Sequence, residues 1–274
     1  MTVTVGSRVR TALVTGASSG IGLELCRLLA RDGARVVMVA RDEGRLQRAA
    51  RWVQAEVPVA ALTLFPTDLV TTGAAAALHA RVAREVGDVD FLANNAGVGL
   101  SGRFSDADPR AVADLVQLNV VGLMEMTGLS LPGMLARRAG RILNVASTAA
   151  YLPGPGMAVY YATKAFVLSF TEALAEETGG TGVTVTVLCP GPVATGFQAR
   201  AGIEGSRLLR SRLVLPAAQV AAAGYRGALE GKRVVVPGFA NKLMVEGLRL
   251  LPRSLAARLA GRAHEPAAGH GGSE

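Results

Sequence analysis

Residues 11–33, TALVTGASSGIGLELCRLLARDG, decide the fold of this chain. The first five residues predict a short buried strand, because they are aliphatic or threonine and a glycine-rich stretch follows them. From Ile21 onward, apolar residues recur at helical spacing and predict a helix that ends near Gly33. A strand, a glycine-rich turn and a helix in this order are typical of the first unit of a parallel α/β sheet.

The same alternation continues to about residue 240. Further strands are expected at 35–40, 59–65, 90–97, 140–147, 183–191 and 232–238. The main helices after the first two units are expected at about 109–138, 158–178 and 216–229. Strands that alternate with helices require right-handed crossovers, which place helices on both faces of one sheet. The sequence therefore predicts an α/β fold, a single Rossmann-like, doubly wound parallel sheet of about seven strands.

The domain organisation follows from the composition of the carboxyl-terminal third. No linker-like stretch interrupts residues 1–240, which we expect to form one catalytic domain. Residues 241–262 predict a basic amphipathic helix with one apolar face, at positions 243, 244, 248, 251, 255 and 259, and Pro252 is expected to break or kink it. Residues 263–274 contain few bulky apolar groups and predict a disordered tail.

Composition excludes several functions. Aromatic residues make up 4% of the chain, too few for a protein that stacks single-stranded bases on aromatic rings. Cys26 and Cys189 stand in no CxxC or metal-ligand spacing, and we interpret them as small buried groups in a reducing compartment. Two of the three histidines lie in the tail. No metal site and no histidine-based triad are expected.

Charge and hydropathy bear on the surroundings of the protein. No signal-peptide core precedes the first strand and no stretch of about 20 apolar residues is evident, so we expect a cytoplasmic protein. Residues 1–199 carry 17 basic and 16 acidic groups, whereas residues 200–262 carry 12 basic and 3 acidic groups. Three interpretations of the basic segment stay open: docking on its own domain or on a sister subunit, which we favour, a peripheral membrane helix that suits a lipid-like substrate, and a disfavoured nucleic-acid contact.

The turn after the first strand is a candidate phosphate-binding loop. Glycines at 16, 20 and 22 let the backbone approach a pyrophosphate at the amino end of the next helix. A purely structural turn is the alternative. The second strand ends in Ala40 and Arg41, where an acidic residue would bind a ribose 2′-hydroxyl. The Arg41 cation favours NADP over NAD, because it can neutralise a 2′-phosphate.

Two acidic residues follow the strands next to this turn. Asp42 is adjacent to Arg41 and is expected to cap the helix that begins there. Asp68, after the third strand, has two interpretations that stay open: a hydrogen bond to an adenine amino group, or a cap on the next helix.

Ser147, Tyr160 and Lys164 form the strongest catalytic pattern. A tyrosine hydroxyl with a pKa of about 10 is a poor base, and an ammonium one helical turn away favours the phenolate. Tyr160 and Lys164 have this i,i+4 spacing, whereas the adjacent Tyr161 has no lysine four residues on. Ser147 ends the fifth strand, at the edge of the sheet where ligands bind.

Together these motifs resemble the short-chain dehydrogenase/reductase family. TGASSGIG at 15–22, NNAG at 94–97, Asn119, Ser147, the Tyr160-x-x-x-Lys164 pair and Pro190-Gly191 occur in the order and separation found in that family. The resemblance covers about residues 8–240. It implies a single-domain oxidoreductase that moves a hydride between nicotinamide and a carbonyl or alcohol carbon.

The resemblance also implies a role for each matching residue. Tyr160 is the expected acid/base, Ser147 orients and polarises the carbonyl, and Lys164 binds the nicotinamide ribose and lowers the tyrosine pKa. Asn119 holds a water that links Lys164 to solvent, and Asn94 ties neighbouring strands together. The expected cofactor contacts are Gly16, Ser18, Ser19, Gly20, Ile21, Gly22, Arg41, Asp68, Leu69, Asn95, Ala96, Gly97, Tyr160, Lys164, Pro190, Gly191, Val193 and Thr195.

The substrate side is less defined by sequence. Residues 192–215 occupy the place of the family's substrate lid, and Leu152, Met157, Phe197 and Leu208 are candidates for an apolar pocket. We expect an NADP(H)-dependent enzyme acting on a ketone, an aldehyde or a secondary alcohol, with a homodimer or homotetramer as its assembly. The alternatives are a non-catalytic NADP-binding regulator and a membrane-associated lipid-binding protein on the same fold.

Overall fold

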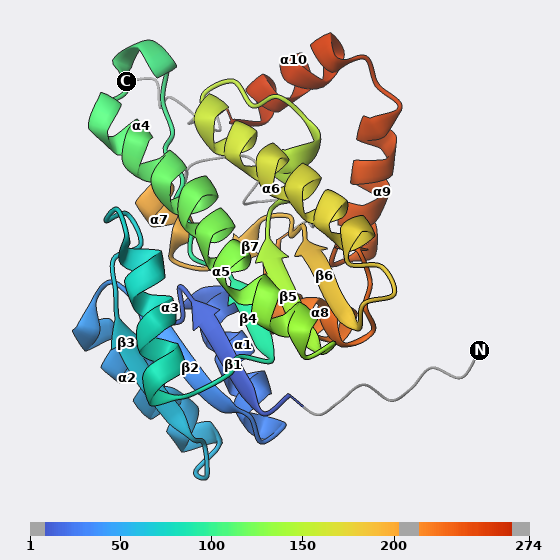
Figure 1. Cartoon of the computed structure of the whole chain (residues 1–274). Helices are drawn as coiled ribbons and strands as arrows, with labels where there is room; N and C mark the ends of the chain where they lie inside the picture. The colour runs from blue at the N-terminus through green and yellow to red at the C-terminus, as the bar shows by residue number, and fades with distance from the viewer. Residues whose placement is uncertain (1–8, 203–213, 265–274) are drawn as a thin grey trace.

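The computed structural model describes residues 9–202 and 214–264. Its centre is a seven-stranded sheet in the order β3-β2-β1-β4-β5-β6-β9, in which every neighbouring pair is parallel (Figure 1). The strands are β1 Thr11–Thr15, β2 Arg35–Ala40, β3 Leu62–Pro66, β4 Phe91–Asn94, β5 Gly140–Val145, β6 Val183–Leu188 and β9 Val234–Val235. The predicted doubly wound sheet is confirmed. Because the strand order reverses between β1 and β4, the sheet opens a crevice at the carboxyl ends of these strands.

Helices cover both faces of the sheet, as expected from right-handed crossovers. Figure 1 shows α1, α2 and α8 on one side and α3, α5 and α6 on the other. The bounds on the first side are α1 Gly20–Arg31, α2 Glu43–Glu56 and α8 Ala217–Leu229. On the second side they are α3 Ala74–Glu85, α5 Leu123–Ala136 and α6 Ala158–Glu177.

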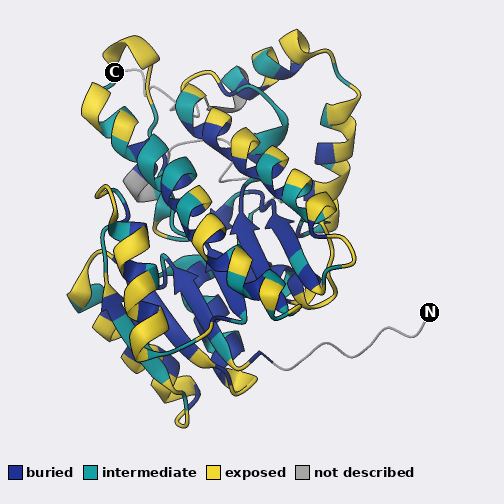
Figure 2. Cartoon of the chain, viewed as in Figure 1, coloured by how far each residue is buried: buried dark blue, intermediate teal, exposed yellow. Residues whose placement is uncertain are grey.

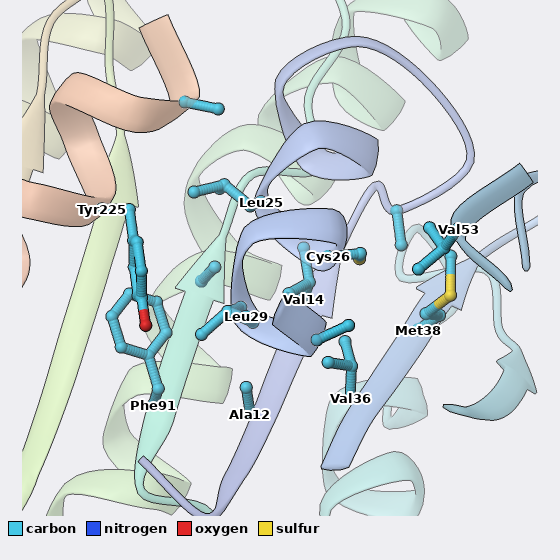
Figure 3. Packing of buried hydrophobic residues seen from close by; sticks show 14 of the residues in the cluster. Ala12, Val14, Leu25, Cys26, Leu29, Val36, Met38, Val53, Phe91 and Tyr225 are labelled. Carbon is cyan, nitrogen blue, oxygen red and sulfur yellow. The ribbon is translucent and has the colours of Figure 1, made fainter. Parts of the chain in front are cut away.

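The core beneath α1 shows why this helix fixes the first unit. Leu25, Cys26 and Leu29 are fully buried, and Figure 3 shows them in one cluster with the strand residues Val14 and Val36. Figure 2 shows the central strands of the sheet mostly buried and the outer turns of the helices exposed. Burial raises the pKa of the Cys26 thiol far above its ordinary value, since the thiolate would lie in an apolar core. The interpretation of Cys26 as a buried apolar group is confirmed.

Several strands are shorter than the sequence predicts. The strand expected at 90–97 ends at Asn94, because the backbone N–H groups of Asn95 and Ala96 both donate to the Thr15 hydroxyl, each over 3.0 Å, and leave the sheet. The strand expected at 183–191 ends at Leu188, and only Val234 and Val235 remain of the last one. Two short strands that were not predicted, β7 Val193–Ala194 and β8 Leu215–Pro216, pair with each other.

The long helix predicted at 109–138 is interrupted by a π-helical turn. It runs as α4 Pro109–Val116, a π-helical turn at Gln117–Gly122 and then α5. By length and composition alone, residues 109–136 form a helix apolar enough to cross a membrane, with a mean hydropathy of 1.2. The expectation that no such stretch exists needs this correction. Within this segment α5 packs on β4, β5 and α3, and 33% of its apolar window is buried inside the protein.

The carboxyl-terminal segment forms two helices, α9 Phe239–Arg249 and α10 Arg253–His264. The predicted break at Pro252 is confirmed. The prediction of one continuous apolar face is wrong, because Leu243 is 64% exposed on α9 while Met244 beside it faces a cavity. Three shorter helical segments complete the described part of the chain: η1 Phe104–Asp106, η3 Thr148–Tyr151 and α7 Phe197–Ala201. The tail beyond 264 and the candidate pocket residue Leu208 lie outside the described residues.

Candidate active site

A cavity of about 780 Å3 lies along the carboxyl ends of the strands. It begins at the glycine turn after β1 and reaches Met244 and Leu248 on α9. Of the residues that the sequence assigned to catalysis or cofactor binding, all line this cavity except Gly22 and Asn119, which lie behind its wall. Tertiary structure therefore gathers residues from position 16 to position 195 around one space.

The glycine turn is shaped by backbone geometry that other residues adopt poorly. Gly16 and Gly20 have φ values of 65° and 56°, in the left-handed region. A Cβ on Gly22 would lie 2.4 Å from the Gly16 carbonyl oxygen and equally close to Asn95 Nδ2. Asn95 Nδ2 donates to the carbonyls of Thr15 (3.0 Å) and Gly16 (3.2 Å). The loop is thus a tight cradle at the amino end of α1, a shape and polarity that fit a pyrophosphate.

Two arginines stand beside the cradle. Arg41 has a side chain 77% exposed, and its Nη1 lies 3.9 Å from Asp68 Oδ2. Arg45, in the first turns of α2, also lines the cavity, although sequence analysis missed it. The signal was present, because Arg41 and Arg45 are four residues apart across the start of a predicted helix. Both arginines line the same cavity as the glycine turn.

The two carboxylates near these arginines differ in role. Asp42 caps α2 as predicted, with its Oδ1 accepting from the backbone N–H of Arg45 at 2.8 Å. Asp68 does not cap the next helix, since α3 begins at Ala74 after Gly73. Instead Asp68 Oδ1 accepts from the N–H of Val70 at 3.1 Å and holds a local turn at the cavity wall. The helix-capping interpretation of Asp68 is therefore wrong, whereas the adenine contact stays a prediction.

Ser147, Tyr160 and Lys164 converge at the middle of the cavity. Ser147 follows β5 and begins η3, where its Oγ accepts from the N–H of Ala149 at 3.1 Å. Tyr160, on the buried side of α6, shares a side-chain hydrogen bond with Ser147. Lys164, one turn further along α6, donates from Nζ to the Val145 carbonyl at 2.9 Å. Two hydroxyl groups and a buried ammonium therefore meet at the edge of the sheet.

The electrostatics of this triad differ from the expectation drawn from its spacing. Burial raises the pKa of Tyr160 to about 12, while the Ser147 hydrogen bond acts in the opposite direction. Burial lowers the pKa of Lys164 to about 8. The lysine Nζ lies 5.8 Å from the centre of the Tyr160 ring and is bonded to backbone, so desolvation outweighs its pull on the phenol. In this structure Tyr160 holds its proton.

Asn119 occupies the π-helical turn behind the lysine. Its Oδ1 accepts from the Val98 N–H at 2.9 Å, and its Nδ2 donates to the Val98 carbonyl at 2.9 Å and to Thr163 Oγ1 at 3.2 Å. A Cβ on Gly97 would come within 3.2 Å of Asn119 Oδ1 and 3.5 Å of Lys164 Nζ. The side chain of Asn119 thus fixes the strand end against α6, and the water relay assigned to it stays a prediction.

The segment after β6 closes the cavity on the other side of the cradle. The Pro190 carbonyl accepts from the Thr148 N–H at 2.8 Å and lies 3.4 Å from Ser147 Oγ. A Cβ on Gly20 would lie 2.9 Å from Thr195 Cγ2, so this segment touches the glycine turn. Pro190, Gly191, Val193 and Thr195, all expected as cofactor contacts from the sequence, line the cavity.

The far end of the cavity is apolar. Leu152, Met157 and Phe197 line it as expected, and the rings of Phe197 and Tyr160 lie 5.5 Å apart between centroids. Sequence analysis missed the contributions of α9 and α10, which are Met244, Leu248, Leu259 and Ala260. No local pattern ties these positions to a motif more than 70 residues away, and only the path of the chain brings them over the cavity.

Three comparisons define the relatives of this chain. Residues 10–204 match the family model described as short chain dehydrogenase. The ketoacyl reductase HetN from Nostoc sp. is 36% identical over 200 residues, or 73% of this chain and 69% of that protein.

Two solved structures are similar to this chain in their fold. A short-chain dehydrogenase from Sphingobium yanoikuyae in complex with NADPH is 31% identical with a TM-score of 0.77, covering 88% of this chain and 94% of its own. A short-chain dehydrogenase/reductase from Burkholderia phymatum in complex with NAD is 27% identical with a TM-score of 0.79, covering 98% and 100%.

The sheet, the glycine cradle, and Ser147 beside the buried Tyr160 and Lys164 define a nucleotide-binding oxidoreductase of the Rossmann type. The chain belongs to the short-chain dehydrogenase/reductase family, whose members bind nicotinamide cofactors and act on small molecules.

Proposed function

We propose that this protein is an NADP(H)-dependent reductase or dehydrogenase, in which Tyr160 exchanges a proton with a ketone, an aldehyde or a secondary alcohol. The observation that carries the proposal is the hydrogen bond between the Ser147 and Tyr160 hydroxyls, one helical turn from Lys164, at the wall of a cavity with a phosphate cradle at one end. The apolar far end favours a hydrophobic substrate, and the name of the Nostoc relative makes ketoacyl compounds the first to test.

In this proposal Ser147, Tyr160 and Lys164 each have a separate role in the reaction. When bound, the nicotinamide supplies or accepts the hydride. Ser147 Oγ donates a hydrogen bond to the substrate oxygen and polarises it. Tyr160 holds its proton at neutral pH, because burial keeps its pKa high, and gives it to the same oxygen during reduction. Lys164 supplies a cation beneath the tyrosine as Tyr160 becomes a phenolate, which the desolvated site would otherwise disfavour.

The preference for NADP rests on the two arginines. Arg41 and Arg45 place two positive charges at the cavity wall beyond the glycine turn, where NAD would offer only a neutral hydroxyl. Asp68 partly offsets Arg41, since the two side chains form a long ion pair. Arg45 has no ion-pair partner among the salt bridges of the described residues, and it therefore strengthens the interpretation that the sequence based on Arg41 alone.

Replacement of Tyr160 by Phe tests the mechanism. Tyr160→Phe removes the transferable proton but keeps the ring, and it should lower kcat by about 10²–10⁴-fold while NADPH binds with nearly unchanged affinity. The measurements are nicotinamide absorbance with a panel of carbonyl compounds, and cofactor titration by fluorescence. Tyr151→Phe is the matched control, because its hydroxyl faces Cys189 outside the cavity and its loss should spare turnover. Near-normal rates for Tyr160→Phe would contradict the mechanism.

Cofactor preference has its own test. Because hydrogen bonds to charged groups contribute about 1.5–3 kcal/mol, the double variant Arg41→Ala with Arg45→Ala should weaken NADPH binding roughly tenfold or more and leave NADH binding nearly unchanged. Arg48→Ala, also on α2 but outside the cavity lining, is the control. If the parent protein prefers NADH, or if the double variant weakens both cofactors equally, the assignment of NADP is wrong.

A further inference from the structure

The outer surface of α9 carries a stripe of large apolar side chains that the fold leaves exposed. Phe239, Leu243 and Leu250 are 83%, 64% and 87% exposed. Phe239 and Leu243 lie one turn apart on α9, and Leu250 caps the end of the helix seven residues further on, a spacing that continues the same face. This face is opposite to the buried side chain of Val245 and to the cavity-lining side chains of Met244 and Leu248. α9 is therefore apolar on two faces, although only one of them is buried in the protein.

The two helices that carry this stripe or follow it are rich in exposed cations, although the Arg249 guanidinium lies over the Tyr151 ring at 5.7 Å. Lys242 and Arg249 lie on α9, and Arg253 and Arg258 lie on α10, against one acidic residue, Glu246. Glu246 is paired with Arg249 at 3.5 Å. Residues 239–261 thus carry four positive charges and one negative charge. Figure 2 shows the outward side of α9 as mostly exposed. An exposed apolar stripe together with exposed cations is the pattern of a helix that lies in the plane of an anionic bilayer.

The positive charge of residues 239–261 also indicates which partner can cover the apolar stripe. Two copies of the chain docked face to face would oppose a net charge of +3 to an identical +3, which disfavours self-association. The tail at 265–274, EPAAGHGGSE, contains no bulky apolar side chain with which to cover the stripe. An anionic lipid surface satisfies both features, since headgroups neutralise the cations and the interfacial region takes up the apolar side chains.

We propose that α9 and α10 dock this protein on anionic membrane surfaces through Phe239, Leu243 and Leu250, with Lys242, Arg253 and Arg258 facing the headgroups. The same two helices line the apolar end of the cavity through Met244, Leu248 and Leu259. Docking therefore sets a wall of the substrate cavity against the lipid phase, where hydrophobic carbonyl compounds concentrate. The docking itself does not depend on the chemistry proposed above.

Vesicle sedimentation with the full chain tests the proposal. The protein should bind phosphatidylcholine vesicles that contain phosphatidylglycerol, and should bind pure phosphatidylcholine vesicles far more weakly. The variant with Phe239→Ser, Leu243→Ser and Leu250→Ser should lose about tenfold or more of its vesicle affinity. Val59→Ser combined with Leu229→Ser, two exposed apolar positions outside this segment, is the matched control and should bind as the parent does.

Charge variants and native mass complete the experiment. Lys242→Gln and Arg253→Gln should each lower the affinity for anionic vesicles about fivefold, and high salt should do the same. Circular dichroism checks that each variant is folded. Failure of the parent to bind anionic vesicles, or binding unchanged in the triple serine variant, would overturn the proposal. A smaller native mass for the triple variant, without vesicle binding by the parent, would identify the stripe as a contact between copies instead.

Discussion

Tyr160 and Lys164 respond to burial in opposite directions. The apolar surroundings raise the pKa of the phenol to about 12 and lower the pKa of the ammonium to about 8, because both groups are more stable there without charge. The lysine consequently holds its charge at neutral pH at some expense to folding, supported by the Val145 carbonyl. Sites where burial shifts the pKa values of ionisable groups in this way are typically functional.

The lowered pKa of Lys164 predicts that the stability of the protein depends on pH. An unfolded chain keeps Lys164 protonated up to its ordinary pKa of 10.5, whereas the folded chain releases that proton near pH 8. The unfolded state binds more protons between these values, so the contribution of Lys164 to the free energy of unfolding rises with pH across that window. In urea unfolding at both ends of the window, Lys164→Met should lose this rise relative to the parent. A stability difference between variant and parent that does not change with pH would contradict the assignment.

Among the elements, the turn between β1 and α1 leaves little room for a larger side chain. A Cβ on Gly22 would meet two atoms at 2.4 Å, the backbone oxygen of Gly16 and Asn95 Nδ2, and hydrogen bonds to the Thr15 and Gly16 carbonyls hold the Asn95 side chain in place. Gly22→Ala should therefore displace the cradle, lower stability by about 1–3 kcal/mol and weaken cofactor binding. Thermal unfolding and cofactor titration measure the two effects.

Gly44 provides the comparison for that prediction. It also lies in the first turn of a helix, α2, but a Cβ there would meet nothing closer than 3.5 Å. Gly44→Ala should be neutral or stabilising by up to about 1 kcal/mol, because alanine is the better helix former. Equal effects of the two substitutions would show that the crowding at Gly22 has no consequence.

At the scale of the whole molecule, a buried polar network joins the central strands to the helices in front of them. Asn94 Nδ2 donates to Asn144 Oδ1 and to Thr127 Oγ1, each at 2.9 Å, and Asn144 Nδ2 donates to Thr171 Oγ1 at 3.0 Å. These bonds link β4 and β5 to α5 and α6. The predicted role of Asn94 in tying strands together is confirmed, and the network extends it to two helices.

Two buried positions should respond oppositely to loss of a polar group. Asn144→Ala removes hydrogen bonds at the centre of the network and should lower the free energy of unfolding by about 2–4 kcal/mol. Thr186, on β6, is fully buried, and its hydroxyl has no hydrogen-bond partner among the described residues. Thr186→Val should be neutral or stabilising by up to about 1 kcal/mol. Chemical denaturation measures both, and a marked loss of stability in Thr186→Val would show that its hydroxyl is bonded.

The sequence by itself determined the parallel sheet, the glycine turn and the order of Ser147, Tyr160 and Lys164. Each of these depends on neighbours in the chain: apolar periodicity selects strand or helix, glycine selects the turn, and i,i+4 spacing aligns two side chains on a helix. The break at Pro252 was predictable for the same reason, because proline disrupts a helix wherever it lies.

Only the tertiary structure decided which residues far apart in the sequence come into contact. It placed Met244 and Leu248 over a cavity built around residues far earlier in the chain, and left Phe239 and Leu243 on the outside. It also reversed the expected direction of the Tyr160 pKa. Spacing places a lysine near a phenol, but burial sets how strongly each charge is disfavoured, and burial is a property of everything that packs around the site.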